Sequence, residues 1–510
     1  MNKELGKLTF RQKVGYGFGD LASCLFWATI MTQLLFFYTD VFGITGKVAG
    51  LMFFVSRILD ALFDVVIGMT ADRTKSRWGK FRPYILWGAI PLAVMAVLTF
   101  TTPEFGHLGK IIYAYVTFII FMFLYSTVNI PYTALLGVIS GDPVERTSAS
   151  SFKFIGAYLG GIIVSATVLP LAAHFGHQNV AKGWTMTMGI YGIAAVIFFI
   201  ITFLATRERI QPIAKEKTSI KDDLKDLSKN VPWMLLFIVT ILFILFVCIR
   251  LSVTTHYFKY YIGEQVVPWL AQFCNYLFLC LNPIIRIINV PIGWFGAHIS
   301  MFTPYSNNQL FGYEVLASIF NSIGQGLSLI GVVLVPWFAR IFGRKSAVII
   351  LFIAAMVFTG SFYFFKPEQL TLILIFQILG SITGGPISAL LWVLYADTAD
   401  YSEWKTGRRA TGLVFSASIM SNKLGWAIGS MIAAFILDQT GFVANIVQNI
   451  NVQNGLKDMM SIIPVAAGIL ALIILVFFYK LDEPTMKKVK TDLEERRKLS
   501  GEAANVGSSQ

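Results

Sequence analysis

The chain has 510 residues, of which 56% are hydrophobic and 14% are charged, and its formal net charge is +13. A soluble globular domain carries roughly 25% charged residues, so this composition excludes a disordered chain, a secreted disulfide scaffold and an ordinary soluble enzyme. The positive charge does not indicate nucleic acid, because the basic residues cluster between long apolar segments. The sequence therefore predicts an all-α membrane protein that crosses the bilayer many times.

A membrane-spanning helix needs about 20 mostly apolar residues. Twelve segments qualify, in two groups of six, near 14–38, 48–70, 83–102, 110–139, 153–174, 184–205, 232–255, 312–336, 347–365, 368–395, 411–437 and 459–480. A polar stretch separates the two groups. We therefore expect an N-terminal half (1–205), a cytoplasmic linker (206–230), a C-terminal half (231–480) and a cytoplasmic tail (481–510).

The basic residues of the short loops predict the orientation. The N-terminal segment, the loop 71–82, the linker and the loops around Arg344 and Arg408 are all basic, whereas each loop on the other side carries about one lysine. Both termini are therefore predicted to be cytoplasmic.

Residues 264–311 are apolar enough to suggest a thirteenth span. A span there would place Arg340, Arg344 and Lys345 outside, against the charge rule. Asparagines and prolines, such as Asn282 and Pro283, also interrupt the segment. We expect an external insertion that lies on the membrane surface or folds over the exit of the cavity.

The two halves repeat faintly. Lys153 is followed by Gly156 and Gly160 in the fifth span, and Lys423 is followed by Gly425 and Gly429 in the eleventh. Each span thus pairs an intramembrane lysine with a small-xxx-small packing motif. Two parallel six-helix repeats are the arrangement of the major facilitator fold, in which the substrate binds between the halves.

The second span carries Arg57, Asp60 and Asp64, although charges inside a span are costly and usually mark a substrate or ion pathway. Asp60 and Asp64 are four residues apart, so both carboxylates project from one helix face. Two such charges need a partner in a low-dielectric site, and Na⁺, Li⁺ or a proton would serve. The alternative is that Arg57 and other basic residues neutralise them structurally.

Other polar residues lie at membrane depth. Asp20 in the first span is a candidate sugar, coupling or gating residue. Lys153, Arg250 and Lys423 are predicted either to hydrogen-bond substrate hydroxyls or to pair with the acidic face of the second span. Trp392 is a candidate for stacking on a sugar ring, with packing between helices as the alternative.

Several segments resemble the glycoside–pentoside–hexuronide:cation symporter family: residues 15–44, 57–84, 129–157, 256–263 and 391–412. The most specific is RILDALFDVVIGMTADRTKSRWGKFRPY. The resemblance implies a secondary active transporter, not an enzyme, in the bacterial inner (plasma) membrane. It would move a sugar or glycoside together with Na⁺, H⁺ or Li⁺ by alternating access, as a monomer, with no cofactor and no nucleic-acid partner. A transporter of the same fold for a non-sugar solute, such as a lysolipid or a drug, is the alternative.

The resemblance also implies site residues. Asp60 and Asp64 match the family's cation-site carboxylates, which would bind Na⁺ if the protein is sodium-coupled, and Ser126 and Asn129 are assigned to the same site. The residues assigned to the substrate are Asp20, Cys24, Lys153, Arg250, Trp392 and Lys423.

Three positions depart from a melibiose-transporting member of the family. Cys24 and Asn129 stand where that member has sugar-binding aspartates, and Thr133 stands where it has a stacking tryptophan. Melibiose is therefore not the expected substrate. The basic residues at membrane depth outnumber the acidic ones by one, which leaves a uronide as an alternative to the neutral glycoside that we expect.

The loop 68–82 is predicted to form a cytoplasmic latch between the halves. Its gating residues would be Asp72, Arg73, Arg77 and Lys80. When the cavity faces outward, they would pair with acidic groups such as Asp142, Glu145 or Asp397.

Overall fold

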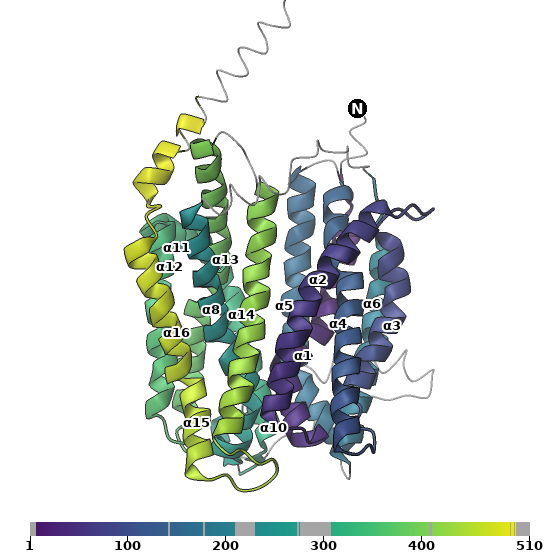
Figure 1. Ribbon diagram of the computed structural model, residues 1–510. Coiled ribbons are helices and arrows are strands. Elements are labelled where there is room, and N and C mark those ends of the chain that lie inside the picture. Colours follow the sequence, from purple (N-terminus) through teal and green to yellow (C-terminus); the bar gives the residue numbers. More distant parts are fainter. Residues whose placement is uncertain are drawn as a thin grey trace, which may run out of the picture.

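The computed structural model describes residues 7–140, 143–176, 179–209, 230–272, 275, 306, 308–406, 411–489, 491–493 and 495. These residues form two helical bundles that stand side by side (Figure 1). Most of the predicted linker lies outside the described residues. The boundaries proposed for the linker and the tail therefore stay predictions.

The N-terminal bundle contains α1 (Phe10–Phe36), η2 (Phe37–Phe42), α2 (Gly46–Arg73), α3 (Arg82–Thr99), α4 (His107–Val138), α5 (Pro143–Gly176) and α6 (Val180–Ala205). The C-terminal bundle contains α8 (Val231–Tyr257), η3 (Phe258–Ile262), α10 (Tyr313–Val333), α11 (Val335–Phe342), α12 (Arg344–Gly360), η4 (Ser361–Phe364), α13 (Leu370–Thr406), α14 (Thr411–Gln439), α15 (Ile450–Met460), α16 (Ile462–Ile473) and η5 (Ile474–Phe478). Polar N-caps begin several of these helices, because a side-chain oxygen can accept from an otherwise unpaired amide of the first turn. Thr9, Thr45 and Asn230 do so for α1, α2 and α8.

Eleven helical segments among the described residues are long and apolar enough to cross a membrane. The helix α2 has 28 residues and is long enough too, but Arg57, Asp60 and Asp64 lie at its centre. It provides the twelfth span, and the all-α prediction of twelve spans in two halves agrees with this arrangement. The charges that make α2 atypical are those of the predicted cation site.

The same close packing holds each bundle together, which confirms the faint repeat seen in the sequence. A Cβ atom on Gly156 of α5 would lie 2.2 Å from the carbonyl oxygen of Gly17 in α1. In the other bundle, a Cβ atom on Gly429 of α14 would lie 2.8 Å from the Cβ of Cys248 in α8. Only glycine permits these helix pairs to approach so closely.

Among the described residues, the bundles contact each other most extensively through the helix pairs α2 with α14, α5 with α10, and α1 with α8. We call the end that carries the N-terminus and the loop 71–82 the basic end, and the other the opposite end (Figure 1). Close contact between the bundles occurs toward the opposite end, where a Cβ atom on Gly46 of α2 would lie 2.6 Å from the carbonyl oxygen of Ala434 in α14.

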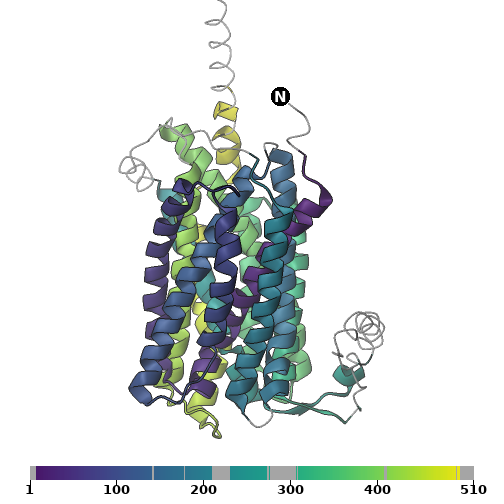
Figure 2. The same ribbon diagram turned by 90° about the vertical axis from the view of Figure 1, so that its right-hand side faces the viewer.

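The predicted insertion is described only at its edges. Its ends pair as a short antiparallel sheet at the opposite end, with β1 (Gln265–Val266) beside β2 (Leu310–Phe311) (Figure 2). Residues 273–274, 276–305 and 307 lie outside the described residues. The proposal that the insertion covers the membrane surface or the cavity therefore stays a prediction.

Candidate functional site: a shared carboxylate pair and a polar contact between the halves

The carboxylates of α2 meet a hydroxyl from α4 and an ammonium from α14. The Oγ of Ser126 lies 2.7 Å from Oδ1 of Asp60 and 2.8 Å from Oδ1 of Asp64. The Nζ of Lys423 donates to Oδ2 of Asp60 at 3.0 Å and also to Oδ2 of Asp64. Asp60 is buried, and Asp64 is partly exposed. Residues of both halves therefore complete one ionic cluster.

The contacts of Ser126 limit the charge state of this cluster. A serine hydroxyl has one proton and can donate only one hydrogen bond. Its oxygen contacts two carboxylates, so the second contact needs either a proton on one carboxyl group or a nearby cation. The arrangement of three oxygens thus favours binding of a proton or a small hard cation.

Arg57 supplies the second positive charge near the carboxylates. Its guanidinium lies 4.4 Å from the centre of the Trp27 ring, and its Nη1 is 3.9 Å from Oδ2 of Asp60. Among the described residues, Nη1 has no hydrogen-bond partner. Arg57 and Lys423 together balance Asp60 and Asp64, so the cluster is neutral when both carboxyl groups are ionised.

Asn129 does not join the carboxylates in this conformation. Its amide nitrogen donates to the hydroxyl of Tyr125 at 2.8 Å, and its amide oxygen accepts from Thr133 at 3.3 Å. Tyr125 in turn stacks on Trp27, with ring centres 5.3 Å apart. The asparagine is therefore held by its own helix α4, one turn from Ser126.

Three of the predicted substrate residues lie together in the N-terminal half. Asp20 of α1 lies within electrostatic reach of Lys153 of α5, and Cys24 lies near both charges. The Nζ of Lys153 is 5.7 Å from the centre of the Tyr132 ring. The close packing of α5 on α1 brings these groups together, because a Cβ atom on Gly160 would lie 2.6 Å from the Cβ of Cys24.

Arg250 and Trp392 lie apart from this group, in the C-terminal half. The guanidinium of Arg250 donates to Oγ1 of Thr359 at 3.2 Å and to Oε1 of Gln377 at 3.1 Å. It faces α12 and α13 rather than the acidic face of α2. Trp392 is partly exposed on α13, with its ring centre 5.9 Å from that of Tyr395.

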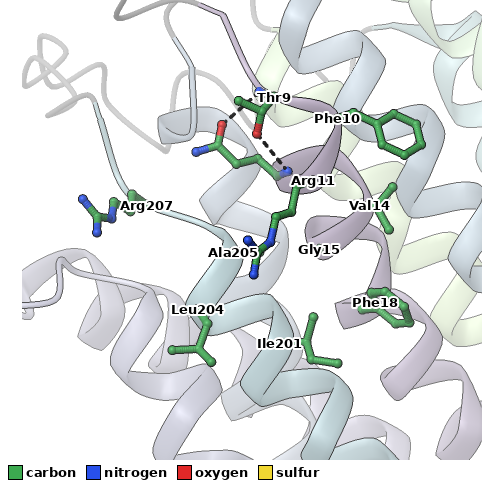
Figure 3. A pocket seen from close by; sticks show the side chains of 11 residues that line it. Thr9, Phe10, Arg11, Val14, Gly15, Phe18, Ile201, Leu204, Ala205 and Arg207 are labelled. Atoms are coloured by element: carbon green, nitrogen blue, oxygen red, sulfur yellow. Dashed lines mark hydrogen bonds between the residues drawn. The ribbon is translucent and has the colours of Figure 1, made fainter.

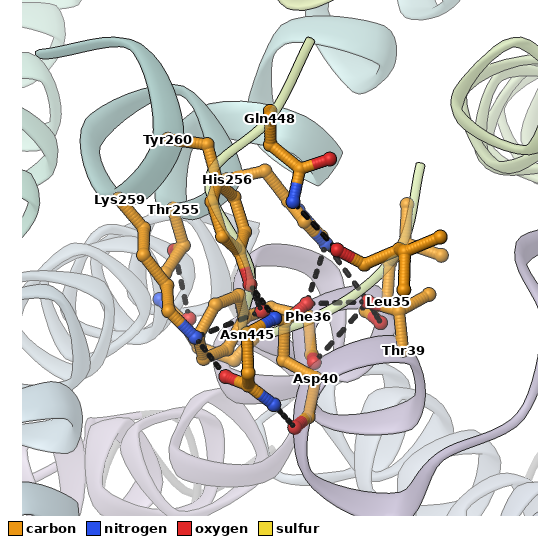
Figure 4. Close-up of polar contacts among 12 residues, drawn as sticks. Leu35, Phe36, Thr39, Asp40, Thr255, His256, Lys259, Tyr260, Asn445 and Gln448 are labelled. Atoms are coloured by element: carbon orange, nitrogen blue, oxygen red, sulfur yellow. Dashed lines mark hydrogen bonds and ion pairs between the residues drawn. The ribbon is translucent and has the colours of Figure 1, made fainter. Parts of the chain in front are cut away.

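A second charged cluster, which the sequence analysis did not single out, joins the halves at the opposite end (Figure 4). Asp40 lies in the π-helical turn η2, and His256, Lys259 and Tyr260 lie at the end of α8 and in the matching π-helical turn η3. The Asp40 carboxylate is 3.2 Å from Nε2 of His256 and 2.9 Å from Nζ of Lys259, and Tyr260 donates to it. Asn445 completes the cluster, since it accepts from Lys259 at 2.7 Å and donates to the backbone oxygen of Asp40 at 2.9 Å.

This opposite-end cluster is deeply buried. His256 is fully buried, and Asp40 is 8% exposed. A buried carboxylate that contacts three donors from another bundle holds the two bundles together at this end. The signal in the sequence was an aspartate and a histidine near the ends of equivalent spans, each beside a run of aromatic residues.

Among the described side chains, the predicted latch residues Arg73, Arg77 and Lys80 form no ion pair between the halves. Arg73 and Arg77 are exposed, and the side chain of Asp72 lies outside the described residues. Among the described residues, the predicted acidic partners are held within their own halves, Glu145 by Lys13 at 2.9 Å and Asp397 by Arg344 at 2.5 Å. The hydrogen bond from Lys13 lowers the pKa of Glu145. Asp142 lies outside the described residues, and the pairing predicted for the other conformation stays a prediction.

The loop that carries the latch residues is held by Glu208. Its carboxylate accepts from the backbone amides of Lys80, Phe81 and Arg82 at 2.8, 2.7 and 3.2 Å. Gly79 has a φ of 105° and leaves room for this carboxylate. The basic loop is thereby fixed to the end of α6.

Comparison with known proteins places the chain in a family. The family described as MFS/sugar transport protein matches residues 15–292 and 295–483. The symporter YnaJ of Bacillus subtilis is 34% identical over 98% of this chain and 98% of its own length. The isoprimeverose transporter of Lactiplantibacillus pentosus is 34% identical over 95% of this chain and 91% of its own.

Solved structures show the same fold at low sequence identity. A D-xylose-proton symporter superposes with a TM-score of 0.58 at 14% identity, over 92% of this chain and 97% of that chain. The nucleoside transporter NupG gives a TM-score of 0.57 at 14% identity, over 92% and 100%. These likenesses and the near full-length relatives confirm the predicted fold and the prediction of a transporter rather than an enzyme. The chain belongs to the MFS/sugar transport protein family of membrane transporters.

Proposed function

We propose that the protein couples uptake of a sugar or glycoside to that of Na⁺, Li⁺ or H⁺ at the carboxylate pair of α2. The observation that carries this proposal is the sharing of one hydroxyl, Ser126, by Asp60 and Asp64. A further support is the set of relatives, which includes an isoprimeverose transporter and, at 28% identity, a glucuronide carrier protein homolog of Escherichia coli.

Lys423 gives this site a means of coupling. Its ammonium contacts both carboxylates from the other half, so it occupies the position where a coupling cation would be most stable. A cation that binds Asp60 and Asp64 competes with Lys423 and removes an ionic contact between the halves. Binding of the cation and release of α14 from α2 are then one event, which is what coupling to a conformational change requires.

The orientation that we propose places the basic end in the cytoplasm, together with both termini. Under this orientation the opposite-end cluster closes the external side, and the conformation is closed to the outside. The coupling cycle then requires the Asp40 contacts to break when the cavity opens outward.

The charges favour a neutral glycoside over a uronide. Asp60 and Asp64 are balanced by Arg57 and Lys423, and Asp20 is balanced by Lys153. The remaining cation, Arg250, is bound by Thr359 and Gln377 in the C-terminal half. Before the coupling cation binds, a substrate between the halves therefore meets no unpaired charge from these residues.

Uptake by the purified protein in proteoliposomes tests the proposal. Inward gradients of Na⁺, Li⁺ or H⁺ are applied separately, with a radiolabelled xyloside, glucoside and glucuronide as substrates. We expect accumulation of a neutral glycoside above its external concentration with one of these gradients. Accumulation of the glucuronide alone would reverse the charge argument, and no accumulation of any of the three would contradict the proposed substrate class.

The orientation has its own test. Lys366 and Arg340 are both exposed. Lys366 lies in the loop between η4 and α13, and Arg340 lies in the short helix α11, next to the start of α12 at the other end of that helix pair. A cysteine in place of Lys366 should react with a membrane-impermeant maleimide added to intact cells, and a cysteine in place of Arg340 should react only after permeabilisation. The reverse labelling pattern would show that the molecule has the opposite orientation in the membrane.

A further inference from the structure

A groove of about 730 Å³ lies between α1 and α6 at the basic end, and it shares no residue with the two charged clusters described above (Figure 3). Its residues are Thr9, Phe10, Arg11, Gln12, Val14, Gly15, Phe18, Ile201, Leu204, Ala205 and Arg207. In Figure 3, Arg11 extends from α1 toward Ala205 and Arg207 lies beyond the end of α6, with Val14 on the other side and Phe18, Ile201 and Leu204 lower in the view. The groove is therefore basic toward the aqueous side and apolar toward the membrane.

The two helices touch within this groove and close its inner side. A Cβ atom on Gly15 would lie 2.2 Å from the Cβ of Ala205, and Thr202 donates to the backbone oxygen of Gly15 at 2.9 Å. The helix α6 ends at this contact, while Phe18 and Ile201 line the groove one turn further into the membrane. The contact prevents a ligand from passing between the two helices at this level.

The apolar wall is continuous with the membrane-facing side of α6. Ile193, Ile197, Ile200 and Leu204 recur at helical spacing, and their exposed fractions run from 37% to 70%. A row of exposed apolar side chains on a membrane helix faces lipid acyl chains. Leu204 belongs both to this row and to the groove. An occupant of the groove can therefore extend an acyl chain along α6 without leaving the bilayer.

The basic rim has no acidic partner within the groove. Both Arg11 and Arg207 are exposed, and the groove contains no aspartate or glutamate. The nearest acidic neighbour in sequence, Glu208, is engaged by three backbone amides of the loop 80–82. Two guanidinium groups above an apolar groove match a phosphate group joined to acyl chains.

We propose that the groove between α1 and α6 binds one anionic phospholipid of the cytoplasmic leaflet, with Arg11 and Arg207 at its phosphate. The acyl chains lie against Val14, Ile201 and Leu204. The assignment to the cytoplasmic leaflet rests on the proposed orientation, whereas the lipid site itself depends only on the groove. The lipid fastens the start of α1 to the end of α6 within the N-terminal half.

Native mass spectrometry of the full-length protein tests the site, after exchange into detergent with either phosphatidylglycerol or phosphatidylcholine added. We expect one tightly retained phosphatidylglycerol and no equivalent phosphatidylcholine. Affinity for phosphatidylglycerol should fall about fivefold for each arginine removed and roughly thirtyfold in the double variant Arg11→Gln/Arg207→Gln. Glycerol phosphate, which has the charge without acyl chains, should not displace the lipid.

The matched control is Lys487→Gln/Lys488→Gln, which removes two exposed charges elsewhere at the basic end. It should retain the lipid like the wild type. Equal retention of phosphatidylcholine, displacement by glycerol phosphate, or equal losses in the two double variants would overturn the proposal. Because binding is measured without transport, failure of the sugar or cation assignment leaves this result unaffected.

Discussion

Asp60→Asn is expected to abolish gradient-driven accumulation, so that the internal sugar concentration never exceeds the external one. Asparagine keeps the shape of the side chain but removes its charge. Lys423 and Arg57 then face a single carboxylate, and the cluster has an excess positive charge before any coupling cation binds. At an effective dielectric constant of 20, a unit charge about 4 Å from the bound cation changes its binding free energy by about 4 kcal/mol. This corresponds to roughly a thousandfold lower cation affinity.

The measurement is uptake in proteoliposomes beside sugar counterflow, which needs no gradient. Counterflow should survive in Asp60→Asn, because Asp20 and Lys153 are untouched. Glu104→Gln is the matched control, since it removes one negative charge from an exposed loop residue and should accumulate sugar normally. The variant Lys423→Gln should have the opposite effect on cation affinity, because it should bind the coupling cation more tightly. It should nevertheless lose coupled transport. Normal accumulation by Asp60→Asn would place the cation site elsewhere.

The sequence predicts the carboxylate cluster well because its physical causes are local. A spacing of four residues places Asp60 and Asp64 on one helix face, and their cost inside a span implies that partners exist. Lys423 was one of three candidate partners at membrane depth. Lys423, rather than Lys153 or Arg250, pairs with the carboxylates because its helix α14 packs on α2. The sequence does not show which helices of the two halves are neighbours.

Arg250 shows where sequence reasoning is insufficient. Its depth in the span is evident from the sequence, but the direction of its side chain is not. The guanidinium binds Thr359 and Gln377, more than a hundred residues away, so only the packing of α12 and α13 against α8 decides that it faces away from the acidic helix. Of the two roles predicted for Arg250, pairing with the acidic face of the second span does not occur in this conformation.

The opposite-end cluster could not be assembled from the sequence for a related reason. Asp40 lies near the end of its span, where a charged side chain adds little to the free energy of membrane insertion. Its presence there therefore does not by itself indicate a functional site. Its partners lie more than 200 residues away, and they meet it only because α1 and α8 both end in a π-helical turn at the interface between the halves. Such turns often occur at functional positions.

Asp40→Asn should open this end of the molecule. The substitution leaves Lys259, whose side chain is 18% exposed, without its buried carboxylate partner. Breaking a buried ion pair by removing one partner costs about 3–5 kcal/mol. Because the contact joins the two bundles, the substitution destabilises the conformation that is closed at the opposite end. It does not destabilise the conformation in which the bundles have separated. The balance between the conformations should therefore shift by a factor of a hundred or more.

A cysteine in place of the fully buried Thr255, which contacts Gln33 across the interface, reports the opening. Its reaction with an impermeant maleimide should be slow in the parent and much faster in Asp40→Asn. Asp458→Asn is the matched control, because this aspartate lies in α15 within the C-terminal half and interacts with the neighbouring Lys457. Adding Lys259→Gln to Asp40→Asn should slow the reaction again, since the unpaired ammonium is then gone. Equal reaction rates in Asp40→Asn and Asp458→Asn would mean that the cluster supports the fold but does not control opening. The closure of this end would then depend on the close backbone packing of Gly46 against Ala434.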